Sequence, residues 1–500
     1  MKKYLKILAK CGIFVFCVSC FIFALSADWL KLYFMNVNIE QILFHLRFPL
    51  VSKSTPFIKD FFIEVLLPSF GLAALVIYLR KISLQIVLSA VICTSSIYIV
   101  ESKFEILAHL EQRKIFSNLY ENHYTAFDLT SVSDFTPKQN LIIILAESLE
   151  STFSSANIPS ALSNIQAVGG GDLQDSQNLA YSPFGELIPN LTNLALKNIN
   201  FSNTNALGGI IQNSNSVNTI TGTLAYLCAI PLNMPFYRND FIHEHFLDSA
   251  ICVSDILAEL GYKQTYFSGL DSAFAGNKFL FQSHSVEVMD LPYFQAQNLV
   301  PNPLPKDLQG FWDLKDAELF KLAKNHLDSL DNSQPFALYI STIDTHSGSL
   351  FVDKEHCGEI SAGYKGAILC GDKIISDFVK WVQTSRFGAN TTIIILGDHL
   401  SHQQFFFPQS TKRFIYNAFI NPRFTQKPTI SLTKNRELSH FDITPLILDS
   451  LGIRAKSFGL GRNPLYGKSL LESEFSLEAF NALIWQRNKI YDSFWEMKKK

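Results

Sequence analysis

The chain has almost no excess of charge of either sign. Lys and Arg number 42 against 44 Asp and Glu, so the formal net charge of the 500 residues is −2. Because nucleic-acid-binding proteins carry a basic excess, we expect no nucleic-acid partner. No internal repeat is present either. The length exceeds that of one ordinary domain and leaves room for a large catalytic unit and a second part.

Charge is scarcest near the N-terminus, where three apolar stretches occur. They cover about residues 11–27, 61–79 and 82–100, and the third contains no charged residue. Each is close to the ~20 residues that a helix needs to cross a membrane. The alternative for the first stretch is a cleaved signal peptide, because ALSA at 24–27 resembles a cleavage site. We favour an uncleaved anchor, because two more spans follow.

Positive residues beside these stretches set the expected orientation. They are Lys2, Lys3 and Lys6 before the first span, and Arg80 and Lys81 between the second and third. The positive-inside rule places both groups in the cytoplasm. Everything after the third span is therefore expected outside the cytoplasm.

Cysteine is sparse, at eight residues, and only four of them lie in the exported part: Cys228, Cys252, Cys357 and Cys370. An even number in an oxidising compartment predicts two disulfides. Sequence proximity favours Cys228–Cys252 and Cys357–Cys370, although three pairings are possible. Four free thiols are the alternative.

Apolar strands alternate with helices in the exported part. The expected strands are 140–147, 263–269, 335–344 and 390–399, and the expected helices are 188–198, 249–262, 363–385 and 440–453. Fully apolar strands in such alternation predict an α/β fold with a mostly parallel sheet covered by helices on both faces. We expect four parts: a transmembrane region at 1–100, a helical connector at 101–137, a catalytic domain at 138–470 and a helical tail at 471–500.

Polar residues follow three of these strands where each strand ends. Glu147 ends the first, Asp344 and His346 follow the second, and Asp398 and His399 follow the third. Ligands of such sheets bind at the carboxyl ends of the strands, where these residues converge. A buried carboxylate is costly unless it is paired or bound to a metal. Carboxylate oxygens and imidazole therefore predict a divalent-metal site, although Asp and His at a strand end can also simply cap a helix.

A hydroxyl-rich loop, 205–231, lies between the first two of these strands and turns apolar from Leu224. A hydroxyl at the start of a helix lies near the positive end of the helix dipole, and a metal can convert it into a nucleophile. The candidates are Ser214, Ser216, Thr219, Thr221 and Thr223. The residues alone do not choose among them, and an ordinary N-cap fits any of them.

The order of these motifs resembles the sulfatase (alkaline phosphatase) superfamily. The segments NLIIILAESLEST, NTITGTLAYLCAIPL, STIDTHSG, ILGDH and HFDITPLILDSLGI carry the resemblance. More narrowly, the chain is similar to membrane-anchored phosphoglycerol transferases, both the lipoteichoic acid synthase type and the enzymes that modify periplasmic glucans. The resemblance spans about residues 138–470. It implies a sulfatase-like catalytic domain on the periplasmic side of the inner membrane.

The resemblance also implies roles for single residues. One divalent metal, Mn, Mg or Zn, is held by Glu147, Thr219, Asp398 and His399, and Thr219 is the nucleophile. His346 matches a histidine that binds the substrate phosphate or protonates the leaving group. The implied reaction moves phosphoglycerol from phosphatidylglycerol in the outer leaflet onto a glycan through a covalent threonine intermediate.

The chain departs from the family in the region SAFAGNKF, 272–279. Lipoteichoic acid synthases have an aromatic residue and an arginine there, whereas Lys278 is the cation here. A lysine ammonium group binds phosphate as a point charge, whereas an arginine guanidinium group can donate two parallel hydrogen bonds. His402 is a further candidate for contact with the phosphate, or a surface histidine. The sulfatase nucleophile motif, Cys or Ser followed by Pro and Arg, is absent, which argues against sulfate-ester hydrolysis.

Three other polar residues near these motifs have structural explanations. His440 and Asp442 are expected to shape a helix start, and Glu150 to support the site or face solvent. Two alternative functions stay open: a phosphoethanolamine transferase acting on lipid A or a glycan, and a non-catalytic sulfatase-like membrane scaffold.

Overall fold

The structure is a computed structural model of the chain. It describes residues 2–34, 54–132, 139–156, 185–233, 245–331, 333–403, 406–408 and 411–496, with a few single residues between them. The chain divides into two compact units, Met1–Ile115 and Phe116–Lys500. The predicted connector, 101–137, is divided between the two units, and the predicted tail belongs to the second.

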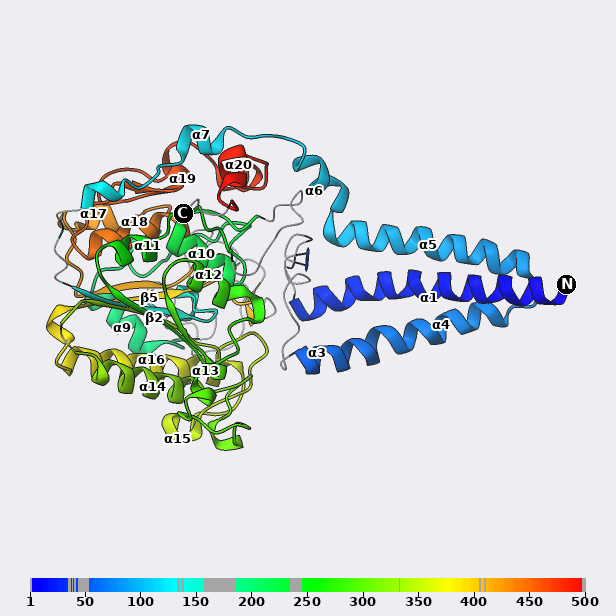
Figure 1. Cartoon of the computed structure of the whole chain (residues 1–500), viewed down its shortest axis with the longest axis horizontal. Coiled ribbons are helices and arrows are strands. Elements are labelled where there is room, and N and C mark those ends of the chain that lie inside the picture. Colours follow the sequence, from blue (N-terminus) through cyan, green and yellow to red (C-terminus); the bar gives the residue numbers. More distant parts are fainter. Residues whose placement is uncertain are drawn as a thin grey trace, which may run out of the picture. The chain divides into compact units, whose positions relative to one another are not determined.

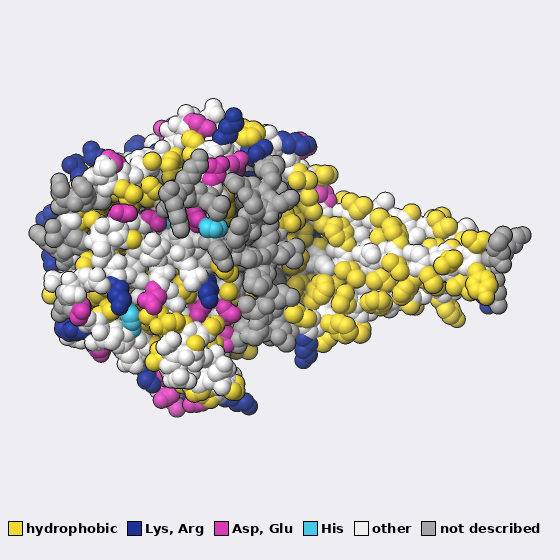
Figure 2. Space-filling model, viewed as in Figure 1, with side chains coloured by type: hydrophobic (Ala, Val, Ile, Leu, Met, Phe, Trp, Pro, Cys, Tyr) yellow, Lys and Arg dark blue, Asp and Glu magenta, His cyan; other side chains and the backbone are white. Residues whose placement is uncertain are grey.

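The first unit consists mainly of long apolar helices. They are α1 (Lys2–Phe34), α3 (Ser54–Phe61) continuing through η1 (Phe62–Leu66) into α4 (Leu67–Tyr78), and α5 (Ile82–Phe104). Within the described residues, three stretches are long and apolar enough to cross a membrane: Tyr4–Leu32, Ile58–Tyr78 and Ile82–Phe104. Hydrophobic side chains cover the surface of these helices (Figure 2). The three predicted spans are thus confirmed as apolar helices of sufficient length.

A six-stranded sheet forms the centre of the second unit (Figure 1). In spatial order its strands are β3 (Glu287–Met289), β2 (Lys263–Ser268), β4 (Phe336–Ser341), β1 (Asn140–Ala146), β5 (Thr391–Gly397) and β6 (Asn417–Ile420). Every pair of neighbours is parallel except β5 and β6. On β1, Ile143 aligns with Tyr339 of β4 on one side and with Ile394 of β5 on the other. The carboxyl ends of β4, β1 and β5 therefore lie side by side in the middle of the sheet.

Helices cover both faces of this sheet (Figure 1). On one face lie α9 (Pro189–Lys197), α14 (Asp316–Ser329) and α16 (Tyr364–Thr384), and on the other α10 (Thr219–Cys228), α11 (Val253–Glu259) and α18 (His440–Ser450). Ile142 and Ile144 of β1 pack in one core with Phe320 of α14 and Phe378 of α16, all of them buried. Strands buried on both faces need apolar residues at every position, which explains the run LIIIL. The predicted fold class is confirmed.

The structure differs from the sequence-based expectation in its short elements. The strands β3 and β6 were not expected, because three or four residues give too little pattern to recognise. The helix expected at 249–262 begins only at Val253, because Asp255 accepts a hydrogen bond from the Cys252 amide at 2.8 Å and fixes the start there. Two disulfides are present, Cys228–Cys252 and Cys357–Cys370, the pairings that proximity favours. The first joins the end of α10 to the start of α11.

Candidate active site

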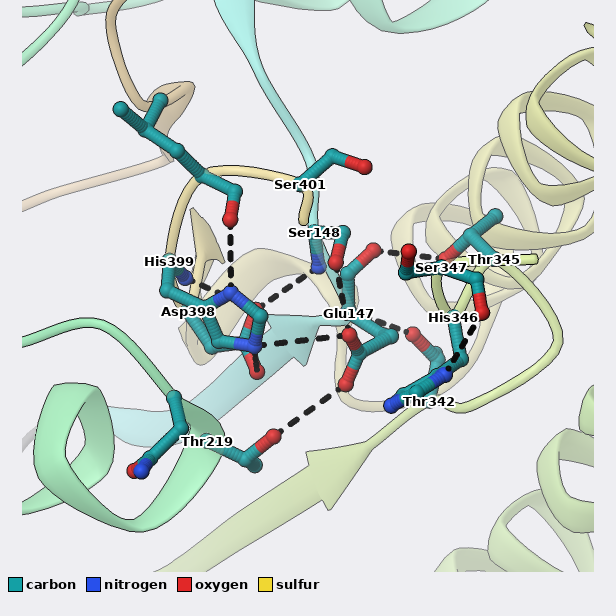
Figure 3. Close-up of polar contacts among 12 residues, drawn as sticks. Glu147, Ser148, Thr219, Thr342, Thr345, His346, Ser347, Asp398, His399 and Ser401 are labelled. Atoms are coloured by element: carbon teal, nitrogen blue, oxygen red, sulfur yellow. Dashed lines mark hydrogen bonds and ion pairs between the residues drawn. The ribbon is translucent and has the colours of Figure 1, made fainter. Parts of the chain in front are cut away.

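Three strand ends bring most of the predicted site residues together at the carboxyl edge of the sheet. Glu147 directly follows β1, His346 lies in the loop after β4, and Asp398 and His399 directly follow β5. Thr219, the first residue of α10, faces the same group (Figure 3). The convergence inferred from the strand pattern is therefore present.

Glu147, Asp398 and His399 form a buried cluster whose ligand atoms all lie within 4.8 Å of one another. His399 Nε2 is 3.4 Å from Glu147 Oε1 and 3.5 Å from Asp398 Oδ2. Asp398 Oδ1 accepts hydrogen bonds from the amides of Ser148 and His399, both at 2.8 Å. Asp398 Oδ2 is buried and has no hydrogen-bond partner within the described residues. One carboxylate oxygen is thus held by the backbone, while the other is left for a different partner.

The electrostatics of the cluster favour a cation. Burial and the neighbouring charge of Glu147 raise the pKa of Asp398 to about 6. Burial alone would lower the pKa of His399, but the Asp398 and Glu147 carboxylates raise it above the ordinary value. Two buried carboxylates repel each other and are costly unless positive charge compensates them. Two carboxylates, an imidazole and an adjacent hydroxyl are donors that Mg²⁺, Mn²⁺ or Zn²⁺ accept, so the residues fit a divalent cation.

Among the five hydroxyls that the sequence leaves open, Thr219 is the one that reaches the cluster. Its Oγ1 donates a hydrogen bond to Glu147 Oε2 at 3.2 Å. Ser214 Oγ accepts from Trp485, Ser216 Oγ donates to Asn213, and Thr221 completes the capping box with Asn218. Thr223 Oγ1 is buried without a hydrogen-bond partner in the described residues. The geometry therefore supports the choice that the sequence reached only through resemblance.

His346 lies at the edge of the cluster with a defined orientation. One ring nitrogen, Nδ1, is 3.1 Å from the carbonyl oxygen of Ser347, so Nδ1 carries the proton and donates it to that oxygen. The other nitrogen, Nε2, lies on the side of Glu147 and Thr219 (Figure 3). Burial and repulsion from His399 lower the pKa of His346 to about 4. His346 is therefore neutral near pH 7, with an available lone pair on Nε2.

The other predicted residues, His402 and Lys278, lie outside the cluster of Glu147, Asp398 and His399. The His402 ring centroid is 5.0 Å from that of His399, and burial and the charge of His399 lower the pKa of His402 well below its ordinary value. Lys278 lies in α12 (Asn277–Ser283) and is partly exposed. Within the described residues, no hydrogen bond or ion pair joins its ammonium group to the cluster. Asp344 is not part of the cluster, and its carboxylate accepts hydrogen bonds from the amides of Phe311 and Asp316.

The sequence analysis missed three residues that fix Glu147. Ser148 adopts a left-handed conformation, with φ 55°, which is strained for a residue with a side chain. Its Oγ donates to Glu147 Oε1 at 2.7 Å while its amide holds Asp398. Thr342 Oγ1 accepts from the Glu147 amide at 2.9 Å, and Thr345 Oγ1 donates to the Glu147 carbonyl at 2.6 Å. No motif indicated them, because isolated Ser and Thr residues are common in loops.

Glu150 and His440 have structural roles close to the site. Glu150 is completely buried, binds the Arg413 guanidinium through both carboxylate oxygens, and accepts from the Ser401 amide at 2.9 Å. It therefore supports the site rather than facing solvent. His440 begins α18, as expected, and its Nε2 is 2.9 Å from the Asp398 carbonyl oxygen. Asp442 completes the capping box with Ser439, also as expected.

A second cluster of ligand-type residues, Cys252, Asp255 and His284, is also buried. Cys252 is bonded to Cys228, so it offers no thiolate. Asp255 Oδ2 is 2.8 Å from His284 Nδ1, and its carboxylate also accepts from the Cys252 amide. This cluster is satisfied internally and serves the fold.

Comparisons with known proteins place the chain among known sequences. The family model described as Sulfatase matches residues 139–453. A phosphoglycerol transferase I from Escherichia coli O6:K15:H31 is 26% identical over 360 residues, which cover 70% of this chain and 42% of that protein. Its counterpart from Salmonella choleraesuis is 27% identical over 347 residues, covering 67% and 40%. This chain therefore spans about two fifths of the length of these curated relatives.

One solved structure with a similar arrangement is the lipoteichoic acid synthase LtaP from Listeria monocytogenes. It is 15% identical, and the match covers 71% of this chain and 81% of that chain with a TM-score of 0.46.

Proposed function

The chain belongs to the sulfatase family, whose model matches well over half of it, and on that premise we propose that it is a membrane-anchored phosphotransferase. In this proposal it moves phosphoglycerol from phosphatidylglycerol onto an extracytoplasmic glycan through a covalent intermediate on Thr219. One observation carries the proposal: the Thr219 hydroxyl donates to Glu147 inside the buried Glu147–Asp398–His399 cluster. The phosphoglycerol transferase relatives support the choice of transferred group.

Glu147, Asp398, His399 and Thr219 are the proposed ligands of one divalent cation. Such a cation lowers the pKa of a bound hydroxyl and polarises the phosphodiester. The protein itself contributes the preorganised donor set. Amides hold Asp398 Oδ1, and the Ser148 hydroxyl holds Glu147 Oε1.

In the first half-reaction, Thr219 Oγ1 attacks the phosphorus of the lipid donor and the bond from phosphorus to the diacylglycerol oxygen breaks. The hydroxyl proton of Thr219 passes to Glu147, which already accepts its hydrogen bond. When the donor binds, the negative phosphodiester stabilises the charged form of His346, which takes up a proton from solvent. The departing diacylglycerol oxygen then takes this proton from His346. The products are diacylglycerol and phosphoglyceryl-threonine.

In the second half-reaction, a sugar hydroxyl attacks the same phosphorus and the bond to Thr219 Oγ1 breaks. His346 Nε2 takes the proton of the sugar hydroxyl, and Thr219 recovers its proton from Glu147. The neutral state of His346 in the resting protein suits this role as a base. Glu147 is then ionised and His346 protonated again, as both were when the donor was bound.

The apolar helices give this chemistry a physical context. A phospholipid donor lies in the membrane, and tethering the enzyme there raises the concentration of donor beside the site. The positive residues around the spans support an orientation with the catalytic unit on the periplasmic side of the inner membrane. The proposed partners are the outer-leaflet phospholipid and the glycan.

The first test replaces the nucleophile. Thr219→Ala should abolish the covalent adduct seen by mass spectrometry after incubation with phosphatidylglycerol, and lower turnover by on the order of a thousandfold or more. Thr223→Val is the matched control, because Thr223 lies one turn further along α10 and its hydroxyl makes no hydrogen bond within the described residues. An adduct that persists on Thr219→Ala would remove this residue from its role.

Two further measurements separate the alternatives. Labelled phosphatidylethanolamine serving as the donor in place of phosphatidylglycerol would indicate a phosphoethanolamine transferase. Elemental analysis that finds no metal in the purified protein, together with no adduct from either lipid, would indicate a non-catalytic scaffold.

A further inference from the structure

The rings of Phe311 and Trp312 lie beside His346, and the ring of Phe274, from another segment, packs against Trp312. Phe311 and Trp312 precede α14, and Phe274 begins η4 (Phe274–Gly276) after β2. The ring centroids of Phe311 and Trp312 are 5.5 Å and 4.5 Å from that of His346. Phe274 meets Trp312 edge-on at 5.7 Å. We refer to Phe274, Phe311 and Trp312 as the aromatic shelf.

Two buried carboxylates fix the shelf to the loop that carries His346. Asp344 accepts from the amides of Phe311 and Asp316 at 2.9 Å and 2.8 Å. Asp316 in turn accepts from the amides of Ile343 and Asp344 at 2.9 Å and 3.0 Å. Buried carboxylates are tolerated when backbone donors satisfy them in this way. The backbone at Phe311 and Asp316 is therefore bound to the loop that carries His346.

The shelf is partly exposed, unlike the large aromatic residues of the core. Phe274, Phe311 and Trp312 are all half-buried, whereas Tyr339 and Phe267 on the adjoining strands are fully buried. The Phe311 ring is inclined by 18° to His346 and by 23° to Trp312, whereas the Phe274 ring is perpendicular to Trp312. Aromatic rings that stay partly open beside a reacting group are typical of a ligand subsite.

The chemistry of the shelf favours a neutral ligand with an apolar face. The charged side chains of the same loop, Asp313, Lys315 and Asp316, are buried, so the loop presents rings rather than charge. A sugar ring combines an apolar C–H face with a rim of hydroxyls, and an aromatic ring supplies the matching flat surface. A phosphate group would instead be attracted to the proposed cation site and to the positive charge of Lys278.

The position of the aromatic shelf beside His346 indicates which substrate would contact its rings. In the proposed second half-reaction, the attacking hydroxyl lies within hydrogen-bond reach of His346 Nε2. The body of the acceptor must then extend over the surface next to this imidazole, where Phe311 and Trp312 pack. We infer that the aromatic shelf is the subsite for the acceptor sugar. This inference rests on the proposed function and adds the place where the glycan binds.

The experiment separates acceptor binding from donor cleavage. Full-length wild type and Trp312→Ala are titrated calorimetrically with a linear gluco-oligosaccharide in the absence of lipid donor. In parallel, diacylglycerol release from phosphatidylglycerol is measured in a single turnover without acceptor. Both are run in the same buffer at the same pH, so that the two proteins are compared under one condition. We expect Trp312→Ala to weaken oligosaccharide binding about tenfold and to leave donor cleavage within about twofold.

Two further variants serve as controls for this experiment. Trp381→Ala removes another half-buried tryptophan, which stacks on Phe378 at 23° away from the site, and should leave oligosaccharide binding unchanged. Trp312→Phe should restore most of the affinity, because it keeps an aromatic face. If Trp312→Ala does not fold, Phe311→Leu replaces it.

Each possible outcome either supports or overturns the inference. Absence of oligosaccharide binding to the wild type, or equal affinity in Trp312→Ala, overturns it. A fall in donor cleavage as large as the fall in affinity also overturns it, because the rings would then serve the donor head group, as in a cation–π contact with ethanolamine. If the wild type cleaves no phosphatidylglycerol but binds the oligosaccharide in a Trp312-dependent way, the proposed function fails while the subsite stands.

Discussion

At the scale of single residues, Glu150 shows how a carboxylate beside the proposed metal site stabilises the structure. It is completely buried, and the guanidinium of Arg413 binds both of its oxygens. Arg413 also donates to the carbonyl of Ser401 at 2.6 Å, and the Ser401 amide donates back to Glu150. This closed set of bonds holds the loop directly after Asp398 and His399. The ion pair therefore fixes the backbone that presents two of the proposed ligands.

Removing one partner of this pair should be costly. Arg413→Ala leaves the charge of Glu150 buried without compensation, so we expect it to lower the free energy of unfolding by about 3–5 kcal/mol. Lys321→Ala is the matched control, because it breaks the exposed Lys321–Glu318 pair, which should contribute less than about 1 kcal/mol. Thermal unfolding of the purified proteins in detergent measures both. Similar small shifts in the two variants would contradict the structural role of Arg413.

At the scale of elements, the backbone of α10 lies in direct contact with the backbone at the end of β5. A Cβ atom on Gly222 would lie 2.1 Å from the carbonyl oxygen of Asp398. Tyr226 one turn later donates to the Gly397 carbonyl at 2.7 Å, and Thr444 of α18 donates to the Ala225 carbonyl at 3.0 Å. The close approach at Gly222 places the start of α10, and with it Thr219, against the cluster.

This docking predicts the effect of one added methyl group. Alanine normally stabilises a helix interior by up to about 1 kcal/mol relative to glycine. Gly222→Ala should nevertheless lower both stability and adduct formation, because the methyl group forces α10 away from Asp398 and separates Thr219 from Glu147. Gly467→Ala is the control, since its added Cβ would meet no atom within 4 Å. Adduct formation at the wild-type rate in Gly222→Ala would show that the contact does not set the position of Thr219.

Elements with a local sequence pattern could be predicted from the sequence. Residues whose role depends on a contact with a distant segment could not. The runs before Glu147 and Asp398 are long and apolar, so strands and their converging ends could be predicted. Thr219 could not be singled out by physics, because its distinction is a contact with Glu147 across the fold. No sequence pattern marks Arg413 or Trp312, because each acts through a contact with a residue in another segment. The strands β3 and β6 are too short to show a period.

At the scale of the whole molecule, the chain combines an apolar helical unit with a catalytic unit that carries two disulfides. Within the described residues, the free cysteines are Cys11, Cys17, Cys20 and Cys93, all in the first unit. Disulfides persist in oxidising compartments and are rare in the cytosol. The distribution of bonded and free cysteines is therefore consistent with the orientation that the positive residues favour.

This distribution gives a test of orientation that needs no activity assay. In a variant with the four free cysteines changed to alanine, a maleimide polymer added to denatured cells should cause no mass shift unless a reductant is present. With reductant, the remaining four cysteines should add four polymers, because Cys228, Cys252, Cys357 and Cys370 are bonded in pairs. A catalytic unit held in the cytoplasm would label fully without reductant, since the glutathione pool keeps thiols reduced there. Changing Cys357 and Cys370 as well should halve the reductant-dependent shift, which assigns half of the signal to the Cys357–Cys370 disulfide.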